Sequence, residues 1–237
     1  DILLSSNQRD MVKALAATGK PVVLILNEGR PRIISDIEPL ANAVVYIMLP
    51  SNYGADALAK LLCGKENFSG KLPFTYPKYP NSLHTYDYKV SENVSTMEGL
   101  YNYDAVMDVQ WPFGAGLSYT SFEYSDLSVT PSEFDRNDII EVSVTVKNIG
   151  ARDGKESVIV YSSDLVASMI PDVRRVRAFE KIDLKARESK TVKFRIPATE
   201  LSFASDDGCW HLEEGDFRIS AGGCSQLIRC TSTAIYK

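Results

Sequence analysis

The sequence predicts an α/β region followed by an all-β region, and three observations support this prediction. Residues 1–82 alternate helical patterns with short, continuous apolar runs. From about residue 122 onward, apolar side chains instead recur at every second position. Residues 83–118, between these regions, are irregular and rich in Tyr, Asn and Asp. The first pattern is typical of a parallel sheet covered by helices, and the second of a β-sandwich.

The first expected element is a helix, which Ser5 or Ser6 can cap. Gly19 stands just beyond its last turn, where a left-handed residue is favoured. The apolar positions of this helix share one face and are Met11, Val12, Leu15 and Ala16.

Two apolar runs, residues 21–26 and 43–49, are too short for helices. Such runs indicate strands buried on both faces, as in parallel sheets. A helix is expected over residues 55–62, ended by Gly64, and a short third strand over residues 72–76. Strand, crossover and strand in this order predict a βαβ-type unit.

Three strands are few for an open α/β sheet, which usually holds about five or six. We therefore interpret this region as the end of a domain whose remainder lies upstream of Asp1. A sheet that lacks strands exposes an edge and an apolar face, and such surfaces drive association. We expect a homodimer or contact with the missing part.

Strict alternation marks the second region. Residues 140–147 alternate apolar and polar side chains and then reach the turn residues Asn148 and Gly150. Further strands are expected over residues 157–161, 191–196 and 217–221. Roughly seven short strands over about 110 residues indicate a β-sandwich of immunoglobulin or fibronectin type.

Composition excludes several classes of partner. The net charge of −5 gives no electrostatic case for nucleic acid or an anionic membrane. No apolar run approaches the ~20 residues that span a bilayer. The sequence also lacks a GxSxG elbow, a phosphate loop and a dinucleotide fingerprint, so we expect no cofactor.

The four cysteines show no CxxC spacing, and the two histidines are far apart in sequence, so no metal site is expected. Cys63 is interpreted as a buried thiol. One disulfide among Cys209, Cys224 and Cys230 is left open, because sequence alone does not assign it.

Several segments resemble glycoside hydrolase family 3. Residues 20–31 read KPVVLILNEGRP and are similar to the strand and GRP loop of that family. Residues 68–77 read FSGKLPFTYP, like its SGKLPFTFP segment. Residues 111–122 read WPFGAGLSYTSF and resemble the PFGYGLSYTTF signature that precedes its fibronectin type III-like domain.

This resemblance implies a barrel domain with the carboxylate nucleophile, an α/β sandwich domain and a fibronectin type III-like domain. Residues 1–122 would be the C-terminal part of the α/β sandwich domain, including the connecting loop 83–118. Residues 123–237 would be the fibronectin type III-like sandwich. The nucleophile would lie in the missing barrel, and the acid/base in a loop just before the first helix. We therefore expect no catalytic residue in this chain.

The resemblance also implies the C-terminal part of a retaining β-glycosidase, similar to a β-glucosidase. Its substrate would be an oligosaccharide or β-glucoside with a terminal β-linked sugar, and its location periplasmic or secreted. The chain would supply scaffold and active-site rim.

Two other functions are kept in view. The chain could be a non-catalytic carbohydrate-binding or interaction module, because a fold alone does not decide function. Affinity of residues 123–237 for an oligosaccharide would favour that function. A self-contained hydrolase would need its own carboxylate pair, drawn from Glu28, Asp36, Glu38 and Asp56.

Ligands of open α/β sheets sit beyond the carboxyl ends of the strands. Asn27, Glu28 and Arg30 follow the first strand, and Asn52 and Tyr53 follow the second. These five residues are our candidates for binding substrate by hydrogen bonds or stacking.

Each candidate also has a purely structural interpretation. Glu28 either tunes the acid/base or forms a salt bridge to Arg30 or Arg32 that holds the loop. Asn52 and Tyr53 either touch sugar or stabilise a turn. The family loop commonly reads Ser-Gly-Arg-Pro, so the loop of this chain points to a subfamily and leaves sugar specificity open.

Three further groups are weighed in the same way. The tyrosines of the long loop either stack on sugars or anchor the loop; they are Tyr86, Tyr88, Tyr101 and Tyr103. Trp210 is expected to fill the sandwich core. The basic cluster is interpreted as a solvated turn or interdomain contact rather than an anion site; it comprises Arg174, Arg175 and Arg177.

Overall fold

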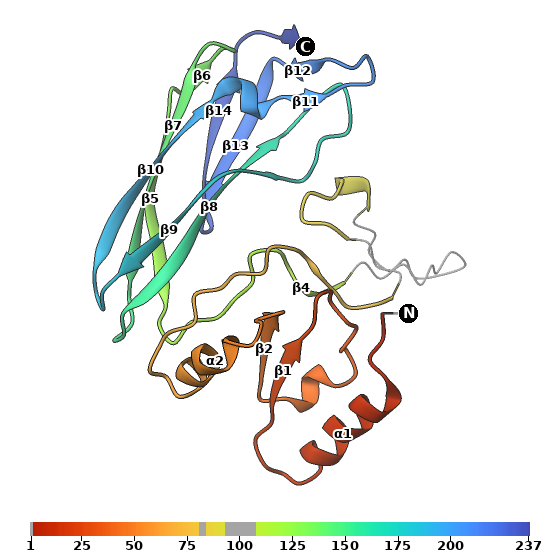
Figure 1. The fold of residues 1–237 in the computed structure, drawn as a ribbon. Coiled ribbons are helices and arrows are strands. Elements are labelled where there is room, and N and C mark those ends of the chain that lie inside the picture. The colour runs from red at the N-terminus through yellow and green to blue at the C-terminus, as the bar shows by residue number, and fades with distance from the viewer. Residues whose placement is uncertain (1, 81–83, 93–107) are drawn as a thin grey trace, which may run out of the picture. The chain divides into compact units, whose positions relative to one another are not determined.

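The structure is a computed structural model that describes residues 2–80, 84–92 and 108–237 (Figure 1). The chain divides into two compact units. The α/β unit comprises residues 1–66, 72–85 and 94–115. The sandwich unit comprises residues 67–71, 86–93 and 116–237. Among the described residues, no helix has the length and apolarity needed to cross a membrane.

The α/β unit begins with helix α1 (Ser6–Ala16), capped by Ser5 as predicted. The Ser5 hydroxyl accepts a hydrogen bond from the Gln8 amide, and the Gln8 side-chain oxygen accepts one from the Ser5 amide. Gly19 follows with φ +71, in the left-handed region. The predicted apolar face is only partly covered, since Val12 is buried while Met11 is 58% exposed.

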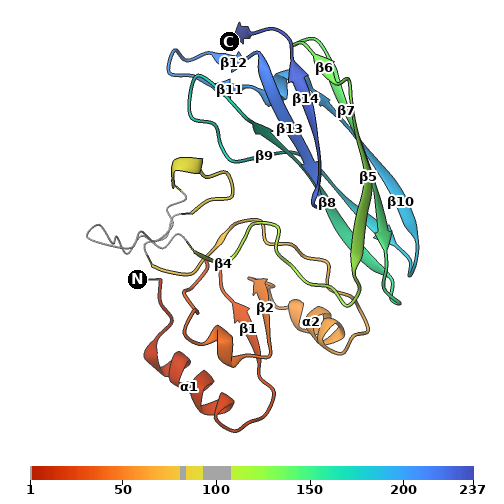
Figure 2. The ribbon, with the colours of Figure 1, turned by 180° about the vertical axis from the view of Figure 1, so that it is seen from behind.

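Strands β1 (Val23–Asn27) and β2 (Ala43–Met48) form the predicted parallel pair. Their connection contains a 3₁₀ helix, η1 (Glu38–Leu40). Helix α2 (Gly54–Leu62) follows β2. Figures 1 and 2 show α1 on the β1 side of the sheet and α2 on the β2 side.

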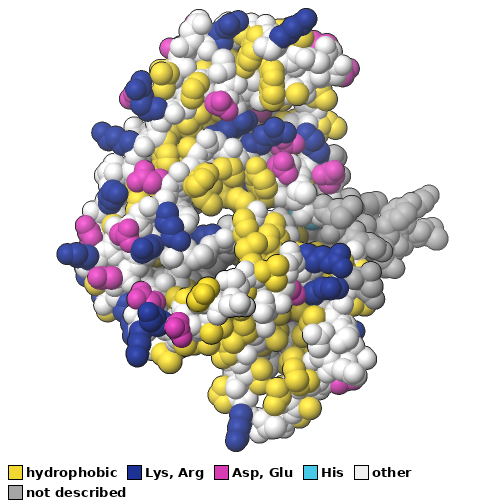
Figure 3. Space-filling model, viewed as in Figure 1, with side chains coloured by type: hydrophobic (Ala, Val, Ile, Leu, Met, Phe, Trp, Pro, Cys, Tyr) yellow, Lys and Arg dark blue, Asp and Glu magenta, His cyan; other side chains and the backbone are white. Residues whose placement is uncertain are grey.

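The prediction that these strands are buried on both faces is wrong. Leu24 and Leu26 face a core formed with Val12, whereas Val23 and Ile25 on the other face are 47% and 39% exposed. Side chains alternate along a strand, and the described part of the chain covers only one face of this two-stranded sheet. Figure 3 shows hydrophobic side chains, in yellow, on the surface of the α/β unit in the lower part of the view.

The predicted third strand also differs. Strand β3 (Tyr76–Pro77) does not join β1 and β2 but pairs antiparallel with β4 (Val109–Trp111). Pro73 and Pro77 lack the amide hydrogens that a longer ladder needs, so only a short pairing forms. The Tyr76 ring is fully buried, and its centroid lies 4.9 Å from that of Trp111.

The sandwich unit confirms the all-β prediction. One sheet has the strand order β10-β7-β5, and the other the order β6-β14-β13-β8-β9. The strands of these two sheets are β5 (Phe122–Thr130), β6 (Glu133–Phe134), β7 (Ile139–Asn148), β8 (Gly154–Asp164), β9 (Arg175–Leu184), β10 (Ser189–Pro197), β13 (Gly215–Ala221) and β14 (Cys224–Cys230). The four segments predicted as strands, residues 140–147, 157–161, 191–196 and 217–221, lie in β7, β8, β10 and β13.

A third, small sheet has the order β11-β12-β15. Its strands are β11 (Phe203–Ala204), β12 (Trp210–Leu212) and β15 (Ala234–Tyr236). The expectation that Trp210 fills the sandwich core is wrong, because its side chain is 45% exposed. Leu212, two residues later in the same strand, is fully buried, so Trp210 lies beyond the edge of the core. Two short helices complete the unit, η2 (Val90–Glu92) and η3 (Ala198–Leu201).

The four cysteines are free thiols. Cys63 is exposed, which corrects its interpretation as a buried thiol. It follows the last residue of α2, a helix that has no fully buried side chain among those described. Cys230 is the buried one, and burial raises the pKa of its thiol.

Asp164, the last residue of β8, makes the stability of the sandwich depend on pH. Burial raises the pKa of its carboxyl to about 6, and Glu213 adds repulsion. A 3.3 Å hydrogen bond from the Val166 amide and the charge of Arg177 act in the opposite direction. Because the folded-state pKa is the higher one, the stability it contributes is present at acidic pH and is lost as pH rises through about 6. We expect Asp164→Asn to melt higher than wild type at pH 8 but not at pH 4. Thermal unfolding followed by circular dichroism checks this, and an equal difference at both pH values would contradict it.

Candidate functional site

A cleft opens at the carboxyl end of β1 in the α/β unit, with a volume of about 870 Å³. Three of the predicted site residues line it, namely Asn27, Glu28 and Arg30. The rest of the wall is formed by Leu3, Leu4, Ser5, Gln8, Gly29, Arg32 and Leu49. Residues with amide, carboxylate and guanidinium side chains thus line a partly apolar hollow, which suits a neutral ligand with many hydroxyl groups.

The Glu28 side chain is held in this cleft by two hydrogen bonds. Its Oε1 lies 2.9 Å from the Tyr76 hydroxyl and 3.2 Å from the Arg32 amide nitrogen, and both groups donate to it. Its backbone carbonyl accepts a hydrogen bond from the Tyr46 hydroxyl at 3.3 Å. One carboxylate oxygen is thus fixed from inside the protein.

The fixing group, Tyr76, is itself immobilised by packing. Its ring contacts those of Trp111, Tyr46 and Phe74. Burial, together with the neighbouring Glu28 carboxylate, raises the pKa of Tyr76 well above its usual range. The Tyr76 hydroxyl therefore stays protonated and remains a donor, shared between Glu28 and the Arg32 carbonyl 2.7 Å away.

The salt bridge expected between Glu28 and Arg30 or Arg32 does not form. Among the described residues, no Lys or Arg side-chain nitrogen lies within 4 Å of the Glu28 carboxylate. The loop is held instead by the tyrosine hydroxyl and the Arg32 amide. A carboxylate held by neutral donors keeps its negative charge available to a ligand.

Sequence reasoning missed one wall of the cleft, the segment before α1. An isolated parallel bridge joins Leu3 to Ile33, and the Ile33 amide donates to the Ile2 carbonyl at 3.0 Å. This pairing brings Ser5 and Gln8 to the cleft beside the β1 loop. A single bridge has no periodic signal, so no pattern in the sequence could have predicted it.

The other two candidates lie apart from this lining. Asn52 and Tyr53 occupy the turn between β2 and α2, after Ser51 with φ +58. Tyr53 is 90% exposed. The structure therefore brings together the three residues after β1 but does not add the two after β2 to the same cleft.

Glu28 is the one carboxylate in the described lining of the cleft. Retaining hydrolysis uses two carboxyl groups about 5–5.5 Å apart. Asp36, another residue considered for a pair, is engaged by Arg9 at 2.6 Å and by Lys13 at 3.7 Å. Across the ranges that the structure describes, no group of three His, Cys, Asp or Glu side chains is placed to hold a metal ion.

The long tyrosine-rich loop is described only in part. The Tyr86 hydroxyl accepts a 3.5 Å hydrogen bond from the Val176 amide, and the Tyr88 carbonyl accepts one of 2.8 Å from the Val173 amide. These two tyrosines thus anchor the loop to the sandwich. Tyr101 and Tyr103 lie outside the described residues.

Comparison with known proteins agrees with this architecture. Residues 1–119 match the glycosyl hydrolase family 3 C-terminal domain, and residues 156–225 match the fibronectin type III-like domain. A "Periplasmic beta-glucosidase" from Salmonella typhimurium is 35% identical over 97% of this chain and 31% of its own length. A "Lysosomal beta glucosidase" from Dictyostelium discoideum is 37% identical over 94% of this chain and 27% of its own length.

A solved structure gives the same result. The crystal structure of a beta-glucosidase from Listeria innocua in complex with glucose is 30% identical and superimposes with a TM-score of 0.89. The match covers 98% of this chain and 34% of that one. The chain thus spans about a third of the length of the proteins it matches. It belongs to glycosyl hydrolase family 3, and carries the C-terminal domain of that family followed by a fibronectin type III-like domain.

Proposed function

We propose that this chain is the C-terminal part of a retaining β-glycosidase that removes terminal β-linked sugars from oligosaccharides or β-glucosides. The observation that carries the proposal is the Glu28 carboxylate, held by Tyr76 at the carboxyl end of β1 in the cleft. A fixed acceptor at this place in an α/β sheet is suited to sugar hydroxyls. The names of the similar proteins, which are beta-glucosidases, point to the same activity.

The two catalytic carboxylates are assigned to parts of the protein outside this chain. Support comes from the cleft, whose described lining offers one carboxylate where retaining hydrolysis needs two. The chain then contributes scaffold and the rim of the sugar site. The rim residues we propose are Asn27, Glu28, Arg30, Asn52 and Tyr53.

Association is part of the proposal. Val23 and Ile25 on the open face of the sheet, and Leu49 beside the cleft at 71% exposure, present apolar surface to solvent. Such surface is normally covered. We propose that the N-terminal barrel of the same protein, or a second copy of the chain, covers this apolar surface.

A periplasmic or secreted location is proposed by analogy, since one relative is named periplasmic and another lysosomal.

The proposal predicts that the 237-residue chain does not hydrolyse aryl β-glycosides, because the described lining of its cleft holds one carboxylate and not a pair. A longer polypeptide that includes the upstream domains should hydrolyse aryl β-glucosides with ordinary turnover. A panel of aryl β-glucosides and aryl β-xylosides, assayed by release of the chromophore, tests both statements. Turnover by the chain alone would contradict the proposal that the catalytic carboxylates lie outside this chain. No turnover by the longer polypeptide would contradict the proposed β-glycosidase activity.

A further inference from the structure

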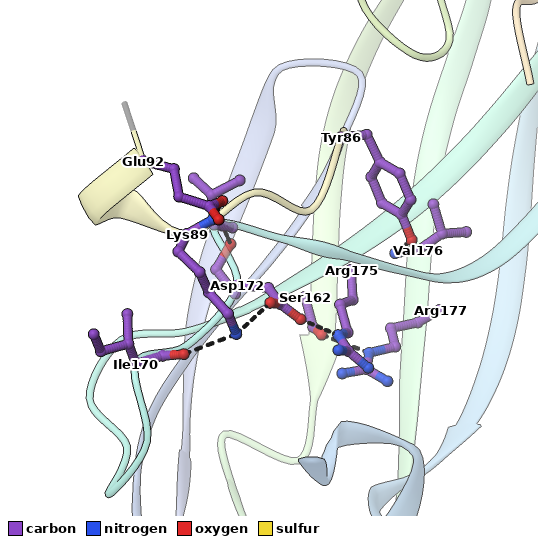
Figure 4. Close-up of polar contacts among 11 residues, drawn as sticks. Tyr86, Lys89, Glu92, Ser162, Ile170, Asp172, Arg175, Val176 and Arg177 are labelled. Carbon is purple, nitrogen blue, oxygen red and sulfur yellow. Dashed lines mark hydrogen bonds and ion pairs between the residues drawn. The ribbon is translucent and has the colours of Figure 1, made fainter. Parts of the chain in front are cut away.

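The basic cluster at the N-terminal end of β9 contains three arginines, of which Figure 4 labels Arg175 and Arg177. The Arg174 guanidinium lies over the Tyr161 ring, 4.6 Å from its centroid. The Arg175 guanidinium pairs with the Asp172 carboxylate. The third arginine, Arg177, is in a different situation.

Arg177 is the extra residue of a β-bulge. The register between β8 and β9 shifts between Val160 and Tyr161, and the shift leaves Arg177 opposite no residue of β8. Bulges of this kind turn a side chain in a new direction and are common beside functional sites. The Arg177 Nε donates to the hydroxyl of the buried Ser162 at 2.7 Å, which fixes the plane of the guanidinium.

This guanidinium forms no ion pair in the described part of the chain, where no carboxylate lies within 4 Å of it. The Asp172 carboxylate is already used, by Arg175 and by the Lys89 ammonium at 2.6 Å. Glu200, Asp172 and Asp164 interact with Arg177 only from longer range. Burial first, and repulsion by Arg175 second, lower the pKa of Arg177 to about 10.

A partly buried cation is better stabilised by a directly bonded anion than by carboxylates that act from longer range. With Nε committed to Ser162, the terminal nitrogens of Arg177 remain as a fork of donors. That fork matches the two oxygens of a carboxylate. A carboxylate adds one negative charge beside the longer-range carboxylates, whereas a phosphate would add nearly two at neutral pH.

We propose that Arg177 binds a carboxylate group at this bulge. The site is independent of the cleft at β1 and of the proposed hydrolysis. Two sources share this chemistry: a free carboxylate such as a sugar acid, or an Asp or Glu side chain from the rest of the longer polypeptide.

The test titrates the 237-residue chain with acetate and with glucuronate and follows the arginine Nε–Hε signals by nuclear magnetic resonance. Glucose and sodium chloride at equal ionic strength serve as controls. We expect the Arg177 signal to move saturably with both carboxylates and with neither control. Sodium phosphate at equal ionic strength should move it less than acetate does.

Variants decide whether the response belongs to Arg177. These variants lack the Arg177 Nε–Hε signal, so their binding is followed by the amide signal of Ser162, whose hydroxyl accepts from Arg177. In wild type this signal should also shift saturably with the carboxylates. Arg177→Gln should abolish the shift, and Arg177→Lys should lower the affinity about tenfold, since lysine keeps the charge but loses the fork. Arg218→Gln is the matched control, because Arg218 is exposed on β13 and also has no ion pair in the described residues. This control should bind like wild type. An Arg177 signal that acetate and glucuronate move no further than sodium chloride does would overturn the proposal.

Calorimetric titration of the longer polypeptide with glucuronate distinguishes the two sources of the carboxylate, a free ligand and a side chain of the same protein. Heat that is lost in Arg177→Gln assigns the site to a free ligand. If the longer polypeptide gives no heat although the 237-residue chain alone binds glucuronate, a side chain of the same protein already occupies the site. Both results support the proposal that Arg177 binds a carboxylate. Heat that persists in Arg177→Gln would contradict the proposal.

Discussion

Replacing Glu28 with glutamine in the longer polypeptide is expected to lower kcat/KM for an aryl β-glucoside about 10- to 100-fold. Hydrogen bonds to a charged group contribute roughly 1.5–3 kcal/mol, and that range sets the expected loss. Glutamine keeps the shape of Glu28 and an oxygen that can accept from Tyr76 and the Arg32 amide. The measured loss therefore reports the charge offered to the sugar rather than a collapse of the loop.

Two companion variants complete this test. Tyr76→Phe removes only the hydroxyl that holds Glu28, so we expect a smaller loss, of about tenfold or less, seen mainly in KM. Glu38→Gln removes the same charge from η1, outside the cleft lining, and should leave kcat/KM unchanged. Unchanged kinetics in Glu28→Gln would remove Glu28 from the proposed rim.

Replacing Gly222 with alanine is expected to destabilise the sandwich by about 2–6 kcal/mol. Gly222 begins the two-residue turn between β13 and β14, with φ +55. A non-glycine residue in this region costs about 1–3 kcal/mol. A Cβ at this position would also meet the Tyr124 ring at 2.1 Å, and overpacking adds about 1–3 kcal/mol.

The Tyr124 ring cannot easily move aside. Its hydroxyl donates to Glu156 Oε1 at 3.0 Å, and Glu156 Oε2 lies 3.3 Å from the Lys71 ammonium. Gly223 is the matched control, since it has φ +91 but nothing within 4 Å of an added Cβ. Gly223→Ala should therefore lose only the backbone part. Urea unfolding of both variants measures the difference, and equal losses would contradict a role for the ring.

Local patterns predicted much of this fold. Ser5 and Gly19 mark the two ends of α1, because capping and left-handed glycine depend on only a few neighbouring residues. Strict alternation located β7, and β8, β10 and β13 were also predicted as strands, since one face of each strand meets the core. The resemblance of residues 20–31 led to the loop that carries Glu28.

The predictions that were wrong concern features that depend on contacts between residues distant in sequence. Tyr76 was assigned to the wrong sheet, because only tertiary pairing with β4 decides where so short a strand lies. Trp210 was placed in the core, although its strand continues past the core's edge. The bulge at Arg177 shifts the register by one residue and leaves no mark in the alternation of β9.

The measurement that tests the central claim most directly is covalent trapping of the longer polypeptide with a 2-deoxy-2-fluoro-β-glucoside that has a good leaving group. A retaining glycosidase forms a glycosyl–enzyme intermediate on its carboxylate nucleophile, and the fluorine slows the second step. We predict one labelled peptide, identified by mass spectrometry, that lies outside these 237 residues. A label on Glu28, Asp36, Glu38 or Asp56 would contradict the account, because the nucleophile would then lie in this chain.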